Sequence, residues 1–397
     1  MNKKKPESKL EKHIRKGYDI LKEGQFEYAI ECFQEIVEII PDFPLPYFYI
    51  GLAYSSLGNY RAAINYYQKS IELEPDNAVS YFGIGGAYVF LEDYQTAKHY
   101  CKKAIEFNPN IADIWTCLGD IAQKEKKHHD AIRYLKKALL LAPEDEIMLN
   151  NLGTIYLSIE NYQEAINCFL KSRKIKPDYA RTTILLGNAY RGLKNCDEAI
   201  RCYKKAIYID PKDHLAYFEL GLVYAYLENF KDAIDYFQKT LDVKPDDMVA
   251  IYNTGIIYFR TEKFREAIPY FKKIIDIDPE SMKAHSMLGK IYCHLEDHHE
   301  AIRYYKKAID IDPNDTHIYN ELGATYSIMK DYDKAIQCFQ TAIDFDNDPR
   351  AYYNMGELYG ELNNEEKQIS YYKKAAQLGD EEAQKWLTEH NLLSNII

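Results

Sequence analysis

The sequence predicts an all-α protein built as a solenoid of helix-turn-helix repeats, and three observations predict it. Glycine recurs every 34 residues from Gly17 to Gly323. Proline recurs with the same step from Pro41 to Pro313. The apolar residues within each period follow the spacing of helix faces. A fixed period of roughly 20 to 50 residues indicates repeats. A single array of units therefore replaces the two or three globular domains that 397 residues would otherwise suggest.

One period, residues 214–247, shows how a unit is built. Its first half places Tyr217 and Tyr224 on one helix face, and its second half places Ala233 and Phe237 on another. Because glycine and alanine recur between these large residues, the two helices of a unit are expected to press together where the side chains are small. One such pair cannot bury its apolar faces alone, so stacked copies must share a core.

The ends of the helices in this unit are marked by polar residues and proline. A short polar turn at residues 227–229 separates the two helices. Pro245 closes the second helix, because proline lacks the backbone N–H and clashes with the preceding turn. Asp246 and Asp247 then offer a side-chain cap to the next helix. The unit is therefore a helix, a turn and a helix.

This pattern resembles the tetratricopeptide repeat, in which an aromatic residue, Leu-Gly, Tyr, Ala, an aromatic residue, Ala and Pro stand at fixed offsets. The fourth unit supplies Trp115, Leu118, Gly119, Ala131, Leu135, Ala138 and Pro143. The ninth supplies His285, Leu288, Gly289, Tyr292, Ala301, Tyr305, Ala308 and Pro313. The resemblance implies a right-handed superhelix whose first helices line a concave side.

The repeats define the expected organisation of the chain. We expect a basic extension at residues 1–9, eleven tandem repeats at 10–381, and a capping helix with a tail at 382–397. The first unit departs from the pattern as an N-terminal cap would. The tenth has Asn347 where the others have the closing proline, and it is one residue shorter. Residues 375–387 resemble the related Sel1-like repeat.

Composition narrows the environment of the protein. The formal net charge of −11 disfavours general binding to nucleic acid or to anionic membranes. No apolar run reaches the roughly 18 to 20 residues of a membrane-spanning helix. The basic start is not followed by the apolar stretch of a secretory signal. The eight cysteines are scattered, with no C-x-x-C pair. A cytoplasmic location is therefore expected.

Sites for chemistry are not expected. His128-His129 and His298-His299 stand at matching places in two units, but a zinc site needs four converging ligands. The glycines at 83–86 look like part of a nucleotide loop, yet they fall within a predicted helix. The sequence predicts no catalytic residues, no metal site and no cofactor, and hence no enzyme.

The candidate binding surface comes from the resemblance. It implies that six places of each repeat face the concave groove, namely the second, fifth, sixth, ninth, twelfth and thirteenth. The first aromatic stretch is Phe48, Tyr49, Phe82, Val89 and Phe90, where Gly83 and Gly86 could leave a hollow or merely allow closer helix packing. A polar stretch follows with Asn150, Asn151, Arg181, Asn188 and Arg191. A second aromatic stretch holds Phe218, Tyr226, Tyr252 and Phe259, with Asn253 and Arg260.

These residue types suit the capture of a peptide. Asparagine both donates and accepts hydrogen bonds, so it can hold an extended backbone without reading its sequence. Arginine can clamp a carboxylate with two parallel hydrogen bonds. Asn151, Asn253 and Asn354 share one offset and resemble, in part, the asparagine ladder in the repeat arm of O-linked N-acetylglucosamine transferase.

The predicted function is a non-enzymatic scaffold that binds an extended peptide or a helix of a partner protein in its groove. One alternative is a self-assembling protein whose basic N-terminal helix docks into another copy. A second alternative is an enzyme with a site built on the groove. No three consecutive units carry the lysine, asparagine and arginine set with which co-chaperones hold the acidic tails of heat-shock chaperones, so no such binding is expected.

Overall fold

The computed structural model describes residues 9–392, and the described residues form 23 α-helices and no strand. The predicted all-α solenoid of helix-turn-helix repeats is confirmed. The chain divides into two compact parts, residues 1–209 and 210–397, each described by itself. From here on these parts are called the first and the second unit, and a single helix pair is called a repeat. The predicted extension at residues 1–9 lies almost wholly outside the described residues, as does most of the tail after the last helix.

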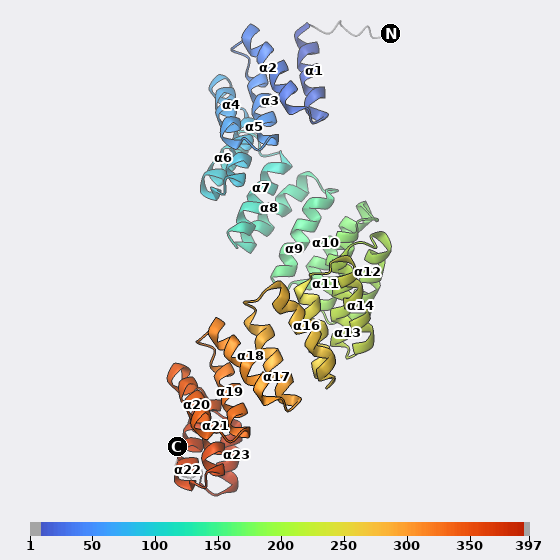
Figure 1. Ribbon diagram of the computed structural model, residues 1–397. Helices are drawn as coiled ribbons and strands as arrows, with labels where there is room; N and C mark the ends of the chain where they lie inside the picture. Colours follow the sequence, from blue (N-terminus) through green and yellow to red (C-terminus); the bar gives the residue numbers. More distant parts are fainter. Residues whose placement is uncertain (1–8, 393–397) are drawn as a thin grey trace. The chain divides into compact units, whose positions relative to one another are not determined.

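The first unit contains six helix pairs, in which each odd-numbered helix is followed by its even-numbered partner (Figure 1). The helices are α1 (Lys9–Lys22), α2 (Phe26–Ile39), α3 (Pro44–Ser56), α4 (Tyr60–Leu73), α5 (Ala78–Phe90), α6 (Tyr94–Phe107), α7 (Ala112–Lys124), α8 (His128–Leu141), α9 (Glu146–Ser158), α10 (Tyr162–Ile175), α11 (Ala180–Gly192) and α12 (Cys196–Ile209).

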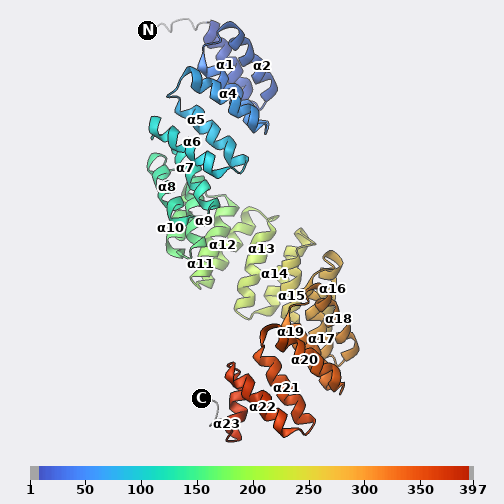
Figure 2. The same cartoon turned by 90° about the vertical axis from the view of Figure 1, so that its left-hand side faces the viewer.

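The second unit contains five helix pairs and one further helix. Figure 2 shows the helices from a second side. The helices are α13 (His214–Tyr226), α14 (Phe230–Val243), α15 (Met248–Arg260), α16 (Phe264–Ile277), α17 (Met282–His294), α18 (His298–Ile311), α19 (Thr316–Ile328), α20 (Tyr332–Asp346), α21 (Pro349–Glu361), α22 (Glu365–Gln377) and α23 (Glu381–Glu389).

The ends of the helices follow the expected side-chain chemistry. Asp247 is the N-cap of α15, and its carboxylate accepts a hydrogen bond from the backbone N–H of Ala250 at 3.1 Å. Such a cap satisfies one of the free N–H groups at a helix start. The turn inside each pair needs one residue in the left-handed conformation, which is Gly58 in the second repeat and Glu228 in the seventh. These short turns hold the two helices of a pair antiparallel.

The recurring glycines are explained by the side chain of the second helix that each one faces, which is an aromatic ring in most repeats, Cys101 at Gly85 and Leu135 at Gly119. A Cβ atom added to Gly221 would lie 2.7 Å from the ring of Phe237, and one added to Gly187 would lie 2.6 Å from the ring of Tyr203. Real Cβ atoms do not approach a ring so closely, so only glycine lets the first helix rest on the ring of the second. The ring itself is fully buried, as Phe237 is in the second unit.

Many of the 37 tyrosines also pack within the pairs. A tyrosine of the first helix stacks on a tyrosine of the second at the same place in several repeats. Tyr224 and Tyr236 have ring centroids 5.4 Å apart and nearly parallel planes, and Tyr292 and Tyr304 repeat this arrangement at 5.5 Å. Offset stacking of this kind adds to the area that the rings bury. The abundance of tyrosine therefore reflects, in large part, packing between helices.

The first helices lie on the inner side of each stack. Consecutive first helices approach each other closely, as α3 does α5 and α5 does α7 in the first unit, and as α17 does α19 in the second. Within residues 9–392, no pair of consecutive second helices comes comparably close. Helices on the inside of a curved stack are the ones that converge. The inner face of each unit is defined as those side chains of its first helices that point away from the core. This face is therefore the concave side of the unit.

Two further properties bear on the environment of the protein. All eight cysteines are free thiols. Among the described helices, none has the length and apolar character needed to cross a bilayer.

Candidate peptide-binding surface

The inner face of the first unit begins with a cluster of aromatic rings. The ring of Tyr49 stacks on Phe33 at 4.9 Å and lies 5.6 Å from Tyr18 on the preceding first helix. Phe48 contacts both Tyr49 at 5.4 Å and the buried Tyr67 at 5.8 Å. Phe48 and Tyr49 are both half-buried, with one side against the core and the other toward solvent. They form an apolar floor on α3.

The next part of this face lies on α5, where the two unusual glycines differ. A Cβ added to Gly83 would lie 2.6 Å from the ring of Tyr67, so this glycine exists to make room for the ring. A Cβ added to Gly86 would meet nothing within 4 Å. Gly83 therefore leaves no hollow, which corrects one half of the sequence expectation, whereas open space does stand beside Gly86.

The other side chains of α5 surround that space. Phe82 and Val89 are half-buried and pack on the core of the first unit. Phe90 is 65% exposed, and its ring stacks on Tyr60 at 4.7 Å. Phe90 thus presents most of its surface to solvent at the edge of the inner face.

The contrast between the two glycines gives a paired prediction. Gly86→Ala is expected to raise the free energy of unfolding by about 0.5–1 kcal/mol, because alanine is the better helix former and the new methyl group meets no atom. Gly83→Ala is expected to lower it, because its methyl group collides with the ring of Tyr67. Urea unfolding of the two variants measures both effects, and equal shifts of the same sign would contradict the assignment.

The polar stretch on α9 and α11 contains both engaged and unengaged side chains. The side-chain amide of Asn150 is hydrogen-bonded to the hydroxyl of Thr182 on the next first helix at 2.9 Å. Asn188 accepts a hydrogen bond from the hydroxyl of Tyr203 at 2.7 Å. Asn151 makes no side-chain hydrogen bond within the described part of the chain. Asn150 and Asn188 therefore use part of their hydrogen-bonding capacity within the fold, whereas the whole side-chain amide of Asn151 remains available to a ligand.

The two arginines of this stretch are exposed on α11. Arg181 stands at the start of the helix and has no ion pair among the described residues. Arg191 stands in its last turn and already interacts with neighbouring groups. Arg181 is therefore the cation with the greater freedom to meet a partner's carboxylate.

The inner face of the second unit begins with aromatic side chains on α13 and α15. Phe218 packs on Phe237 at 5.7 Å, and Tyr252 meets Phe271 edge-on at 5.6 Å. Burial raises the pKa of the Tyr252 phenol. Asn253 donates from its amide to the carbonyl of Val249, one turn back on its own helix, at 2.8 Å. Its carbonyl oxygen therefore remains as the acceptor for a ligand.

The far end of α15 is also occupied by contacts of the fold. Phe259 lies 5.4 Å from the ring of His294 on the next first helix. Arg260 is held by Glu228 at 3.5 Å and lies over the ring of Phe230. Tyr226 is more exposed to solvent than Phe259 and Arg260 are. The part of the inner face on α13 and α15 is thus mainly aromatic, and its polar groups Asn253 and Arg260 are partly engaged by the fold.

Two sets of residues on the inner face are not among the binding residues predicted from the sequence. Lys290 on α17 lies 2.8 Å from His317 and 3.6 Å from Glu321 on α19, so charged groups continue the face in the second unit. Asp120 on α7 is half-buried, and burial raises the pKa of its carboxyl group, while Lys124 opposes that effect. Both sets stand at the six places that the resemblance implies, so reading those places in every repeat could have found them.

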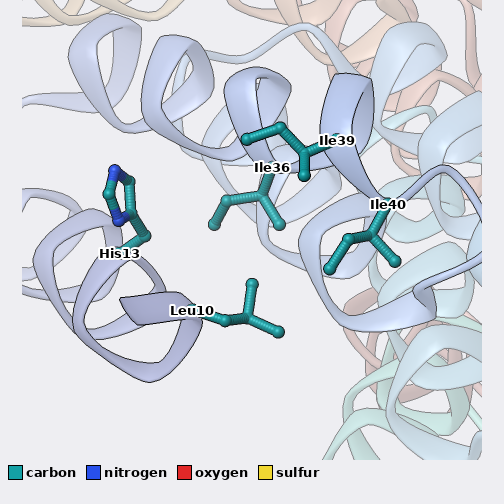
Figure 3. Close-up of a pocket in the computed structure, with 5 residues that line it drawn as sticks. All are labelled: Leu10, His13, Ile36, Ile39 and Ile40. Carbon is teal, nitrogen blue, oxygen red and sulfur yellow. The ribbon is translucent and has the colours of Figure 1, made fainter. Parts of the chain in front are cut away.

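Concavities elsewhere lie outside the inner faces. One of about 300 Å³ lies between α1 and α2, where Leu10 and His13 face Ile36, Ile39 and Ile40 (Figure 3). Another is lined by His128, His129 and neighbouring residues at the start of α8. Within residues 9–392 no group of three or more His, Cys, Asp or Glu side chains is arranged to hold a metal ion.

One of the similar solved structures supports the fold. The C-terminal part of a tetratricopeptide repeat protein from Cytophaga hutchinsonii is 18% identical, with a TM-score of 0.52 over 60% of this chain and 98% of that one. YrrB, described as a repeat protein with an unusual peptide-binding site, is 27% identical over 47% of this chain and 96% of that one, with a TM-score of 0.42. Yeast Tom70 is 14% identical over 96% of this chain and 94% of that one, with a TM-score of 0.44. No curated protein matches the sequence significantly.

The family comparison covers most of the chain. Tetratricopeptide repeats match residues 44–77, 78–111, 110–178, 144–212, 178–246, 214–280, 280–348 and 349–378. These stretches follow one another without a gap, and the Sel1-like character of the C-terminal end stays a prediction. Repeat arrays of this kind present extended binding surfaces, which supports a general role as a protein-interaction scaffold. The chain belongs to the tetratricopeptide repeat family.

Proposed function

We propose that the protein is a non-enzymatic scaffold that binds an extended segment or a helix of a partner protein on the inner faces of its units. The observation that carries this proposal is the inner face of the first unit. There, half-buried rings lie on α3 and α5, and side chains that the fold leaves unengaged lie further along the same face, on α9 and α11. A cytoplasmic location is proposed with it, since the eight thiols are free.

An extended peptide fits this arrangement better than a helix does. The amide of Asn151 can both donate to and accept from a peptide backbone, and a peptide that has no internal hydrogen bonds leaves those groups available. Arg181 can pair with a carboxylate of the same segment. A helix satisfies its own backbone and would use only the rings.

The alternative of self-assembly through the N-terminal helix involves residues 1–16, of which residues 1–8 lie outside the described part of the chain. No contact described above favours it over peptide binding, so it is kept as an outcome of the test and not as a second proposal.

Selection from a displayed library of random 12-residue peptides, followed by fluorescence polarisation with a selected peptide, tests the proposal. The double variant Asn151→Ala, Arg181→Ala is expected to weaken binding at least about tenfold, because each group makes a hydrogen bond or ion pair that water must replace. The measured quantity is the dissociation constant of the labelled peptide.

A matched control is available on the second helices of the same unit. Asn167→Ala, Arg61→Ala removes the same two residue types from exposed places on α10 and α4, and it is expected to leave binding within about twofold. If both double variants weakened binding equally, or if only self-association were detected by light scattering, the inner face would not be the binding surface.

A further inference from the structure

We propose that the inner face between α5 and α7 binds a basic side chain, lysine or arginine, of the partner segment, with the Asp120 carboxylate as its counter-ion. This inference rests on the proposed function and names the chemistry of the partner at one place. The place is called the Gly86 site, and it comprises Phe82, Gly86, Val89, Cys101, Cys117 and Asp120.

The open space at the site arises because two residues, Gly86 and Cys101, are small where most other repeats have larger ones. In most repeats a large ring on the second helix fills the space under the inner face. Tyr67 reaches Gly83 of the next repeat, and the hydroxyl of Tyr203 reaches Asn188 of its own. In the third repeat this ring is replaced by Cys101, whose sulfur lies 3.5 Å from that of Cys117. With a glycine at 86 as well, no side chain fills the space.

The repeat geometry places Asp120 at the rim of that space. In two other pairs of neighbouring first helices, the residue equivalent to Gly86 contacts the residue equivalent to Cys117. Tyr18 contacts Tyr49, and Lys290 contacts Glu321. Asp120 follows Cys117 by three residues on α7, and residues three apart share a helix face. By the same rule, Asp120 adjoins Asn151 on the next first helix.

The charge at the rim has no hydrogen-bonded partner within the described part of the chain, although Lys124 attracts it through space. Asp120 makes no hydrogen bond or ion pair among the described residues, although it is half-buried. Burial raises the pKa of its carboxyl group, and Lys124, one turn further along α7, is the group that lowers it. A half-buried carboxylate without a hydrogen-bond donor is costly, and a cation that arrives with a ligand would remove that cost.

The walls select the kind of cation. Phe82 and Val89 are half-buried apolar groups of the same core cluster that contains Cys101. A lysine or arginine side chain has an apolar stem that can lie against such walls, while its charged head reaches the carboxylate at the rim. An acidic side chain would meet the negative charge of Asp120. A purely apolar side chain would leave that charge unpaired.

The test uses the full chain and peptides selected from a random 12-residue display library. Against the wild-type chain, the selected peptides are expected to share a lysine or arginine at one position. Replacing that residue by norleucine, which keeps the stem and removes the charge, is expected to weaken binding about tenfold or more. Asp120→Asn should weaken the basic peptide similarly and should hardly affect the norleucine peptide, because the two changes remove the same interaction.

Two further variants separate this inference from a change in folding. Glu106→Gln removes one negative charge from an exposed place on α6 and is expected to leave binding unchanged. Gly86→Leu should reduce binding of the basic peptide by filling the open space, while circular dichroism shows an intact helical fold. Selected peptides without a shared basic residue, or an Asp120→Asn effect no larger than that of Glu106→Gln, would overturn the inference and leave the proposed function standing. If the wild-type chain selected no peptide, both would fall together.

Discussion

Phe237→Ala is expected to lower the free energy of unfolding of the second unit by about 3–5 kcal/mol, as measured by urea denaturation. The ring of Phe237 is fully buried and lies between the two helices of its repeat. Its loss removes apolar contacts and leaves a cavity that the backbone cannot close completely. Because each repeat of a solenoid packs against its neighbours, the loss of stability should extend to the adjoining helix pairs.

The glycine opposite this ring supplies the control. Gly221→Val alone is expected to cost about 1–3 kcal/mol, because its added atoms collide with the ring 2.7 Å away. In the Phe237→Ala background the same change should cost much less, since the cavity can accept the new methyl groups. Additive losses in the double variant would contradict the interlock between the glycine and the ring.

Raising the pH above about 10 is expected to destabilise the protein steeply through its buried tyrosines. Tyr67 is 2% exposed and Tyr305 is 0% exposed, and burial raises the pKa of each phenol well above its ordinary value. Above the ordinary pKa the unfolded chain loses these protons while the folded chain keeps them. Stability therefore falls by about 1.4 kcal/mol per pH unit for each tyrosine. The contribution is fully present below about pH 10.

Replacement by phenylalanine isolates this contribution from the thiols, whose pKa values burial also raises, as at Cys168 and Cys202. Urea denaturation of wild type and Tyr305→Phe at pH 9 and pH 11 should show a loss that is smaller in the variant by about 1.4 kcal/mol. Equal losses in the two proteins would mean that water reaches the phenol in the folded state.

The fold could be predicted from the sequence because its determinants are local and repeated. The glycine and proline period fixes the helix pair, and the small residue opposite a ring fixes how the two helices touch. Asp247 could be recognised as a cap because its position directly precedes a helix. Each of these signals acts within one repeat, and ten or more copies of a signal leave no room for a competing register.

The binding surface could be predicted only in part, because its properties depend on contacts between repeats. Gly83 and Gly86 look alike in the sequence, yet the ring of Tyr67 from the preceding repeat fills the space beside only one of them. Asn150 and Asn151 are adjacent, yet only Asn150 is engaged by Thr182 on the next first helix. The position of a residue within its repeat does not reveal these contacts between repeats. The contacts decide which polar groups and which spaces remain available to a partner.

Photo-cross-linking tests the central claim, that partners bind on the inner faces, most directly. A selected peptide carrying a photoreactive residue is bound to the wild-type chain, irradiated, and its attachment points are mapped by mass spectrometry. If partners bind on the inner faces, attachment is expected on the first helices, such as α5, α7 and α9. Attachment instead to the outer surface of the second helices, where Leu140 and Tyr208 are 81% and 87% exposed, would contradict it.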